Sequence, residues 1–118
     1  MRNRQTHLGD FVLKENQQHS VPIIIQDGNL TLETNASFLD EVTFINHHKA
    51  VLMHNHSFIY HLIMMNGGDI YCMDENVLID ELTIEGHVII HVPNSSCELT
   101  DFVNRINGVY YKVVRDID

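Results

Sequence analysis

The chain has 118 residues, of which 44% are hydrophobic and 19% are charged, and its formal net charge at pH 7 is −9. This composition fits one folded domain and excludes a disordered chain. Because it has only seven Lys and Arg residues, no basic stripe can neutralise phosphates, and we expect no direct binding to nucleic acid. No apolar run reaches the length of a membrane span or forms a signal-peptide core, so we expect a cytoplasmic protein without membrane contact.

In chain order the pattern is one of short strands. Residues 1–10 are polar and predict a flexible N-terminal arm, which leaves residues 11–118 as a single domain. The apolar runs 21–25 and 30–33 enclose turn residues and predict a hairpin. A second hairpin is expected where residues 66–69 join the run 58–65 to the run 70–73. Further runs, at residues 42–45, 50–53, 77–79, 88–92 and 109–114, continue the same spacing.

Two features depart from a plain series of hairpins. Leu99, Phe102, Val103 and Ile106 have helical spacing, although the neighbouring sequence favours β-structure there. In addition, the motif at residues 35–38 recurs at 55–58, and residues 39–43 are echoed at 79–83. A period of about twenty residues is also typical of a right-handed β-solenoid whose corners stack asparagines, and this is our alternative fold.

The candidate metal ligands begin with a His-x-His pair. On a strand, His54 and His56 would point to the same face, where they could hold a divalent metal if other strands supply further ligands. His61 and Cys97 complete this set. The alternative is that these side chains are ordinary surface or core residues, since the chain has nine histidines. No serine, cysteine or carboxylate pair has a spacing that indicates a catalytic residue.

Methionine and aromatic side chains cluster in the middle of the sequence. Methionine fills irregular spaces, so such a lining suits a pocket for an apolar or amphipathic small molecule, although ordinary core packing is the alternative. The candidate residues for an effector pocket are Met53, Phe58, Tyr60, Leu62, Met64 and Tyr71.

The segment 54–114 resembles the cupin superfamily in its His-x-His pair, its glycine turn, and Gly86 followed by Pro93. It departs from the cupin metal enzymes because Tyr60 stands where they have a glutamate. The run from Gly86 to the Pro93–Asn94 turn, with the closing strand 109–114, is similar to the N-terminal regulatory domain of AraC-type transcription regulators. The resemblance implies an all-β, cupin-like antiparallel jelly-roll barrel.

Three functions follow from these readings. The first, implied by the resemblance, is a ligand-sensing regulatory domain that binds a small-molecule effector inside the barrel, without a cofactor. Exposed barrel edges and a mobile arm would also allow a homodimer. The second is a stand-alone metal-dependent cupin enzyme, with a divalent metal at the histidine set. The third is a self-associating β-solenoid structural protein. The sequence leaves open whether the chain is an enzyme.

Overall fold

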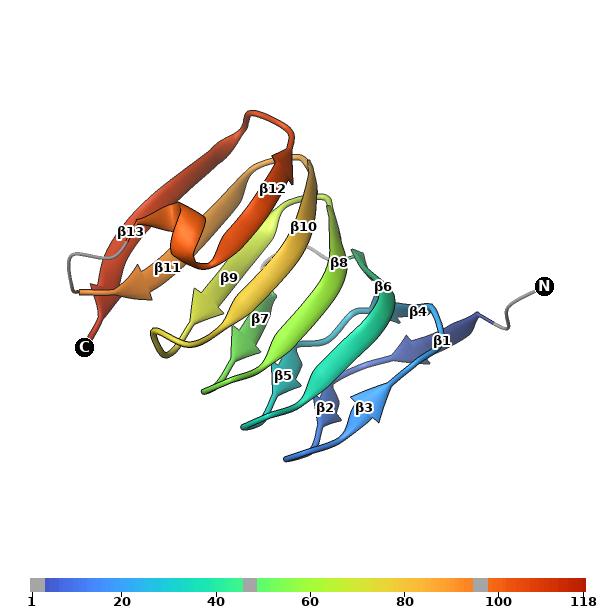
Figure 1. Ribbon diagram of the computed structural model, residues 1–118. Coiled ribbons are helices and arrows are strands. Elements are labelled where there is room, and N and C mark those ends of the chain that lie inside the picture. Colours follow the sequence, from blue (N-terminus) through green and yellow to red (C-terminus); the bar gives the residue numbers. More distant parts are fainter. Residues whose placement is uncertain (1–3, 46–48, 95–97) are drawn as a thin grey trace.

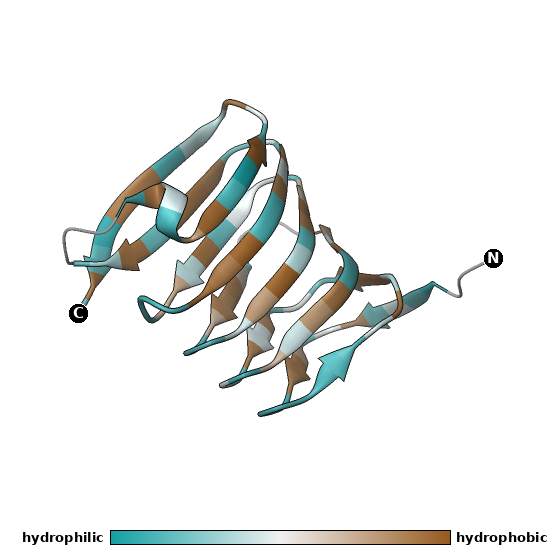
Figure 2. Cartoon of the chain, in the orientation of Figure 1, coloured by the Kyte–Doolittle hydropathy of each residue, from teal (hydrophilic) through white to brown (hydrophobic). Residues whose placement is uncertain are grey.

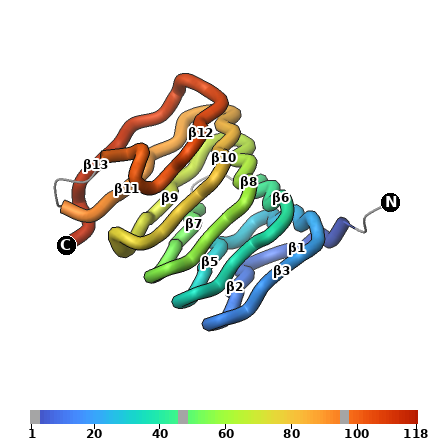
Figure 3. The backbone as a smooth tube through the Cα atoms, viewed as in Figure 1, coloured from blue at the N-terminus to red at the C-terminus, as the bar shows by residue number. Residues whose placement is uncertain are grey.

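The computed structural model describes residues 4–45, 49–94 and 98–118. The chain winds through about five turns of a β-solenoid, and its coils stack along one axis from the N-terminal to the C-terminal end (Figure 1). Two parallel sheets face each other across the core. The tube trace in Figure 3 shows the first coil and the last coil at opposite ends of the stack.

Each coil contributes strands to both sheets. Sheet A holds seven strands in the described residues: β1 (Gln5–Leu8), β3 (Gln18–His19), β4 (Ile23–Gln26), β6 (Ser37–Ile45), β8 (Phe58–Met65), β10 (Leu78–Glu85) and β12 (Val103–Asn107). Sheet B holds six: β2 (Phe11–Leu13), β5 (Leu30–Leu32), β7 (Ala50–Met53), β9 (Gly68–Cys72), β11 (Val88–Pro93) and β13 (Tyr111–Ile117). A short 3-10 helix, η1 (Leu99–Asp101), precedes β12.

The all-β prediction is confirmed, but the antiparallel jelly-roll barrel is wrong and the solenoid alternative fits. Every described strand pair is parallel. The two predicted hairpins are wrong for the same reason. Their turns carry the chain from one sheet to the other, so β8 and β9 do not pair with each other. Each strand pairs instead with strands one coil away.

The core is a stack of apolar columns. The strands alternate in burial, as β6 shows with its pattern of buried and exposed side chains. The inward residues lie above one another in register, so that Ile23, Val42, Leu62 and Leu82 form one continuous column. All four are at most 2% exposed. Figure 2 shows hydrophobic segments, in brown, on successive strands along the stack.

The corners between β8 and β9 and between β10 and β11 require glycine. Gly67 has φ of +79°, and a Cβ there would lie 2.4 Å from the His87 carbonyl oxygen one coil further on. Gly86 has φ of +98° and would meet Gly67 N at 2.7 Å. Side chains therefore cannot fit where adjacent coils touch at this corner.

The opposite corner carries the asparagines expected of a solenoid. Asn35 Nδ2 donates to Asn16 Oδ1 at 3.1 Å, and Asn76 Nδ2 donates to Asn55 Oδ1 at 3.4 Å. Asn16 and Asn35 both adopt positive φ, which asparagine tolerates better than most residues. Each pair links the turns of two neighbouring coils.

Two further segments differ from simple expectation. Residues 5–8, inside the segment for which we expected a flexible arm, form β1 and pair with β4. The helical spacing around residues 99–106 produces only η1, and the segment then extends into β12. Phe102, between the two, is 0% exposed and fills the core beneath the last coil.

Candidate functional site

The six predicted effector-pocket residues do not surround a common cavity. Met53, Leu62 and Met64 are 0% exposed and belong to the packed core. Tyr60 is 47% exposed on the outside of sheet A. The remaining two, Phe58 and Tyr71, are half-buried. The interior that was expected to admit a ligand is filled by side chains between two sheets.

The predicted metal set is divided between a corner and a sheet face. His54 and His56 lie in the turn before β8, not on a strand, and His56 has φ of +59°. His61 lies on β8, where its Nε2 is hydrogen bonded to Thr83 Oγ1 at 2.8 Å. Cys97 lies outside the described residues. Within those residues no group of three or more His, Cys, Asp or Glu side chains could hold a metal ion.

The outer face of sheet A carries a row of charged and polar side chains. Register places Glu41, His61, Glu81 and Arg105 side by side on successive strands. Arg105 forms an ion pair with Glu81 at 3.2 Å, and His61 Nδ1 lies 3.6 Å from Glu41 Oε2. Parallel sheets usually have both faces covered. The polar side chains of this row allow the outer face of sheet A to be exposed to water.

The outer face of sheet B carries a tighter polar cluster, which sequence reasoning missed. The His91 side chain is buried between two carboxylates. Its Nε2–H donates to Asp69 Oδ2 at 2.8 Å, and its Nδ1–H donates to Asp116 Oδ2 at 2.8 Å. Tyr71 stacks on the imidazole with ring centroids 4.1 Å apart and an interplanar angle of 5°. The cluster joins β9, β11 and β13 across three coils.

This arrangement favours the doubly protonated imidazolium of His91. Burial lowers the pKa of His91, but the hydrogen bonds to Asp69 and Asp116 and the charges of the two carboxylates outweigh burial and raise it. Two ionised carboxylates can only accept hydrogen bonds, so both ring nitrogens must donate. The cluster therefore fastens the end of β13 to the sheet through charge-assisted hydrogen bonds.

The last coil leaves an edge and an apolar surface open. On one side β13 pairs with β11, and no described strand pairs with its other side. Just before it, Val109 is 77% exposed and Tyr110 is 63% exposed. A hollow of about 390 Å³ lies here. Its lining residues are His87, Val88, Ile89, Val109, Tyr110, Tyr111 and Lys112.

The first coil presents the corresponding open edges on β1 and β2. Phe11 is half-buried there, and its ring lies edge-on to two imidazoles. The ring centroids are 5.0 Å apart for His7 and 6.0 Å apart for His19. His19 Nε2 is hydrogen bonded to Gln5 Oε1 at 2.8 Å. Val12, on the outer face of β2, is 42% exposed.

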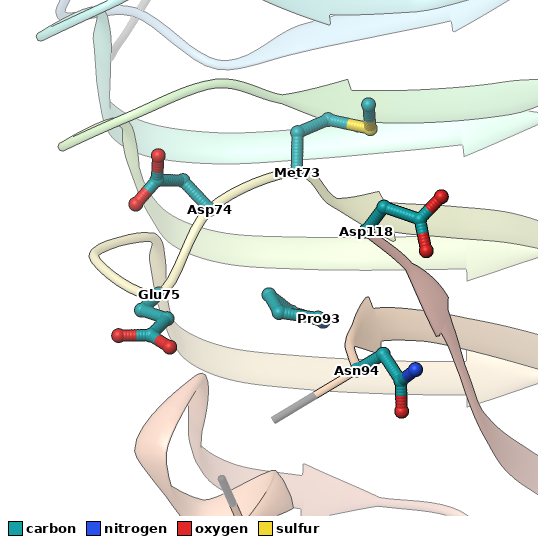
Figure 4. A pocket seen from close by; sticks show the side chains of 6 residues that line it. All are labelled: Met73, Asp74, Glu75, Pro93, Asn94 and Asp118. Carbon is teal, nitrogen blue, oxygen red and sulfur yellow. The ribbon is translucent and has the colours of Figure 1, made fainter. Parts of the chain in front are cut away.

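A further hollow of about 420 Å³ lies at the corner where β9, β11 and β13 end (Figure 4). Three carboxylates, those of Asp74, Glu75 and Asp118, line it with Met73, Pro93 and Asn94. A third hollow, of about 330 Å³, is lined by Glu15, Glu33, Thr34 and His54. None of the six predicted effector-pocket residues lines any of these three hollows.

The sequence held a signal for the His91 cluster. In the run 88–92, Val88 and Ile90 are buried core residues, so alternation places His91 on the opposite, outer face. The three partners could not be found this way. Asp69 and Asp116 are separated from His91 by 22 and 25 positions, and only the coil register brings them together.

No protein-family model, no curated protein and no solved structure matches this chain. The cupin and AraC-type resemblance therefore stays a prediction. Across the parts of the chain that the structure describes, no helix is long and apolar enough to cross a membrane.

Proposed function

We propose that this chain is a structural β-solenoid that self-associates through its end coils. The observation that carries this proposal is that backbone edges of described strands are open at both ends, on β1, β2 and β3 at one end and on β12 and β13 at the other. Unpaired strand edges are templates for pairing with another chain. The described residues contain no α-helix, and the one short helix, η1, contacts β12.

The parallel arrangement makes the two ends complementary. In a stack of parallel coils, each coil pairs one backbone edge with the coil before it and the opposite edge with the coil after it. The first coil therefore leaves one kind of edge unpaired, and the last coil leaves the other kind unpaired. An interface between two different surfaces of the same chain is heterologous, and it builds an open filament when the rotation does not close. Self-association of this kind suits a scaffolding role.

The two other functions inferred from the sequence find less support. A ligand-sensing domain and a metal-dependent cupin both need the interior of a barrel, and the core here is packed with apolar side chains. The fold does not bring the predicted effector-pocket residues around one cavity, and it separates the predicted metal ligands. Both stay untested predictions.

Sedimentation velocity over a wide range of protein concentration tests the proposal. We expect species larger than the 13.6 kDa monomer, with a mass that rises with concentration. A strictly monomeric chain at every concentration would contradict it.

Edge-blocking variants supply the control. The backbone groups of Phe11 and Leu13 bond to β5, since Phe11 N–H donates to Asn29 O and Glu33 N–H donates to Leu13 O. The groups of Val12 therefore point to the open edge. Just before β13, Tyr110 O accepts the Val88 N–H and so points toward β11. Because backbone groups of successive residues point to opposite sides of a strand, the N–H and C=O of Val113 point to the open edge.

The double variant Val12→Pro/Val113→Pro removes one N–H donor from each open edge of sheet B and no bond inside the stack. We expect it to remain folded by circular dichroism and to sediment as a monomer. Association that survives in a folded double variant would exclude these edges of sheet B as the contact.

A further inference from the structure

From the register of the stack we infer that a second copy docks head to tail on sheet B, with its β2 against the open edge of β13. This inference rests on the proposed self-association and names its partner and geometry. The surface it uses is defined by Lys112, Val113, Val114 and Arg115 on β13 and by residues 10–13 around β2.

The register of such a contact is not a free choice. Inside the stack, Val12, Thr31, Leu52, Tyr71, His91 and Val114 form one outward row that crosses every strand of sheet B. A second copy that continues the stack places its own Val12 next in this row. Lys112 then lies beside Asp10 of the next copy, and Val113 lies beside Phe11 of the next copy.

The charges match in this register. Lys112 is exposed and faces outward, and none of its described contacts neutralises it. Asp10 uses Oδ1 to accept the Asn29 N–H at 2.8 Å, which leaves its second carboxylate oxygen for a cation. Asp116, at the bulge of β13, comes level with Lys14 of the next copy. Opposite charges on neighbouring strands stabilise a sheet, and like charges there destabilise it.

The apolar surfaces match as well. Phe11 and Val113 are half-buried and pack against opposite ends of the same inward column, which runs through Leu30, Val51, Ile70 and Ile90. Joining the ends would cover both side chains and make this column continuous from one copy to the next. Apolar surface withdrawn from water at this point stabilises the contact.

Cysteine cross-linking tests the geometry. Adjacent strands are about 4.8 Å apart, a separation that a disulfide spans. The background is Cys97→Ser, with Cys72 kept because burial raises its pKa to about 12 and makes its thiol inert. We expect that neither Val12→Cys nor Val114→Cys forms a covalent dimer by itself after mild oxidation, and that an equal mixture of the two does.

The combined variant Val12→Cys/Val114→Cys should give a ladder of covalent oligomers on a denaturing gel without reductant. Dimers of Val114→Cys alone would show that two C-terminal ends meet, and dimers of Val12→Cys alone would show that two N-terminal ends meet. Either result overturns the head-to-tail inference but leaves self-association intact. Absence of any cross-link in a chain that sediments as a monomer overturns both.

Charge reversal supplies a second readout. Lys112→Asp sets a carboxylate beside Asp10 of the next copy, and we expect roughly tenfold weaker association from the lost attraction and new repulsion. Lys49→Asp, at an exposed corner in mid-stack, changes the net charge equally and should have no effect. Asp10→Asn in the other copy keeps the oxygen that accepts the Asn29 N–H and should recover part of the loss. Equal weakening by the two lysine variants would overturn the inference.

Discussion

The first and last coils end the same core in different ways. In sheet A the first coil places Gln5 and His7 in the inward columns of Val42 and Phe44, and both are accessible to water. The last coil continues the first of these columns with Ile106. In sheet B both ends stay apolar. One end of a solenoid can thus be polar in one sheet while the other sheet keeps an apolar open edge.

This difference has a physical reason. A terminal coil must cover the core or leave apolar surface in water, and terminal repeats of solenoids commonly present a polar outer face for solubility. Gln5 and His19 bond to each other at the N-terminal end, which satisfies one nitrogen of the imidazole. The polar side chains of Gln5 and His7 at this end of sheet A should keep association through sheet B weak enough to be reversible.

The largest effect is expected from breaking the core under the last coil. Phe102 is 0% exposed, and its carbonyl oxygen accepts the Ile79 N–H at 2.7 Å. Phe102→Ala should lower the free energy of unfolding by about 3–5 kcal/mol through loss of buried surface and the cavity left behind. Urea unfolding measures it. Val109→Ala, at a side chain 77% exposed, is the control, and a similar loss in both variants would refute the packing argument.

Exchanging residues between the two ends of one column sharpens the comparison. Ile106→Gln should lower the free energy of unfolding by about 1–2 kcal/mol, because Ile106 is only half-buried. Gln5→Ile should make the N-terminal end of this sheet A column apolar. We expect it to increase the affinity of self-association several-fold, as measured by sedimentation. Gln5→Ala, which removes the same hydrogen bond without adding apolar surface, should not. Stronger self-association of both Gln5 variants would contradict the idea that an apolar side chain at this position is what promotes it.

The smallest effect concerns pH. The folded chain raises the pKa of His91, so it binds this proton more tightly than the unfolded chain does. The stabilisation is full below the ordinary histidine pKa of about 6.5 and is lost as pH rises through the raised pKa. Its size should be only about 1 kcal/mol, since the Asp116 side chain is 46% exposed and screened by water.

Urea unfolding at pH 6 and pH 8.5 measures this contribution as the difference between the wild-type chain and His91→Gln. The difference should shrink as pH rises. The groups that face His91 are Asp69, Asp116 and Tyr71. The pKa of Tyr71 is raised, first by burial and then by the two carboxylates, which places its titration above this range. A difference that grows with pH would show that His91 is neutral in the folded chain.

Alternation of apolar residues predicted strands well and their partners badly. The runs 30–33 and 58–65 correspond to β5 and β8, and the turn expected at residues 66–69 is shorter, because Gly68 and Asp69 already belong to β9. A period of two residues reports which side is buried, but it carries no information on how far away the pairing strand lies. The turn residues suited a hairpin equally well. Only the weak repeat pointed to parallel coils.

Even that repeat was partly misleading, because β6 contains an extra residue. Phe38 pairs with Ile59, 21 positions on, whereas Glu41 pairs with His61, 20 positions on. In the echo between residues 39–43 and 79–83, residues 41–43 and 81–83 are true equivalents two coils apart, whereas Ile79 is in register with Phe38 and not with Leu39. The echo between residues 35–38 and 55–58 is out of register by one. The His-x-His pair, which we placed on a strand because of its two-residue spacing, lies in a corner.

The stacking of coils also gives the molecule a unit of length. Each coil touches only its immediate neighbours, so removal of one complete middle coil would leave both ends and every remaining neighbour contact of the same kind. The spacing of strands sets the increment at about 4.8 Å per coil. Chains of this kind with different numbers of coils would therefore differ in length by equal steps.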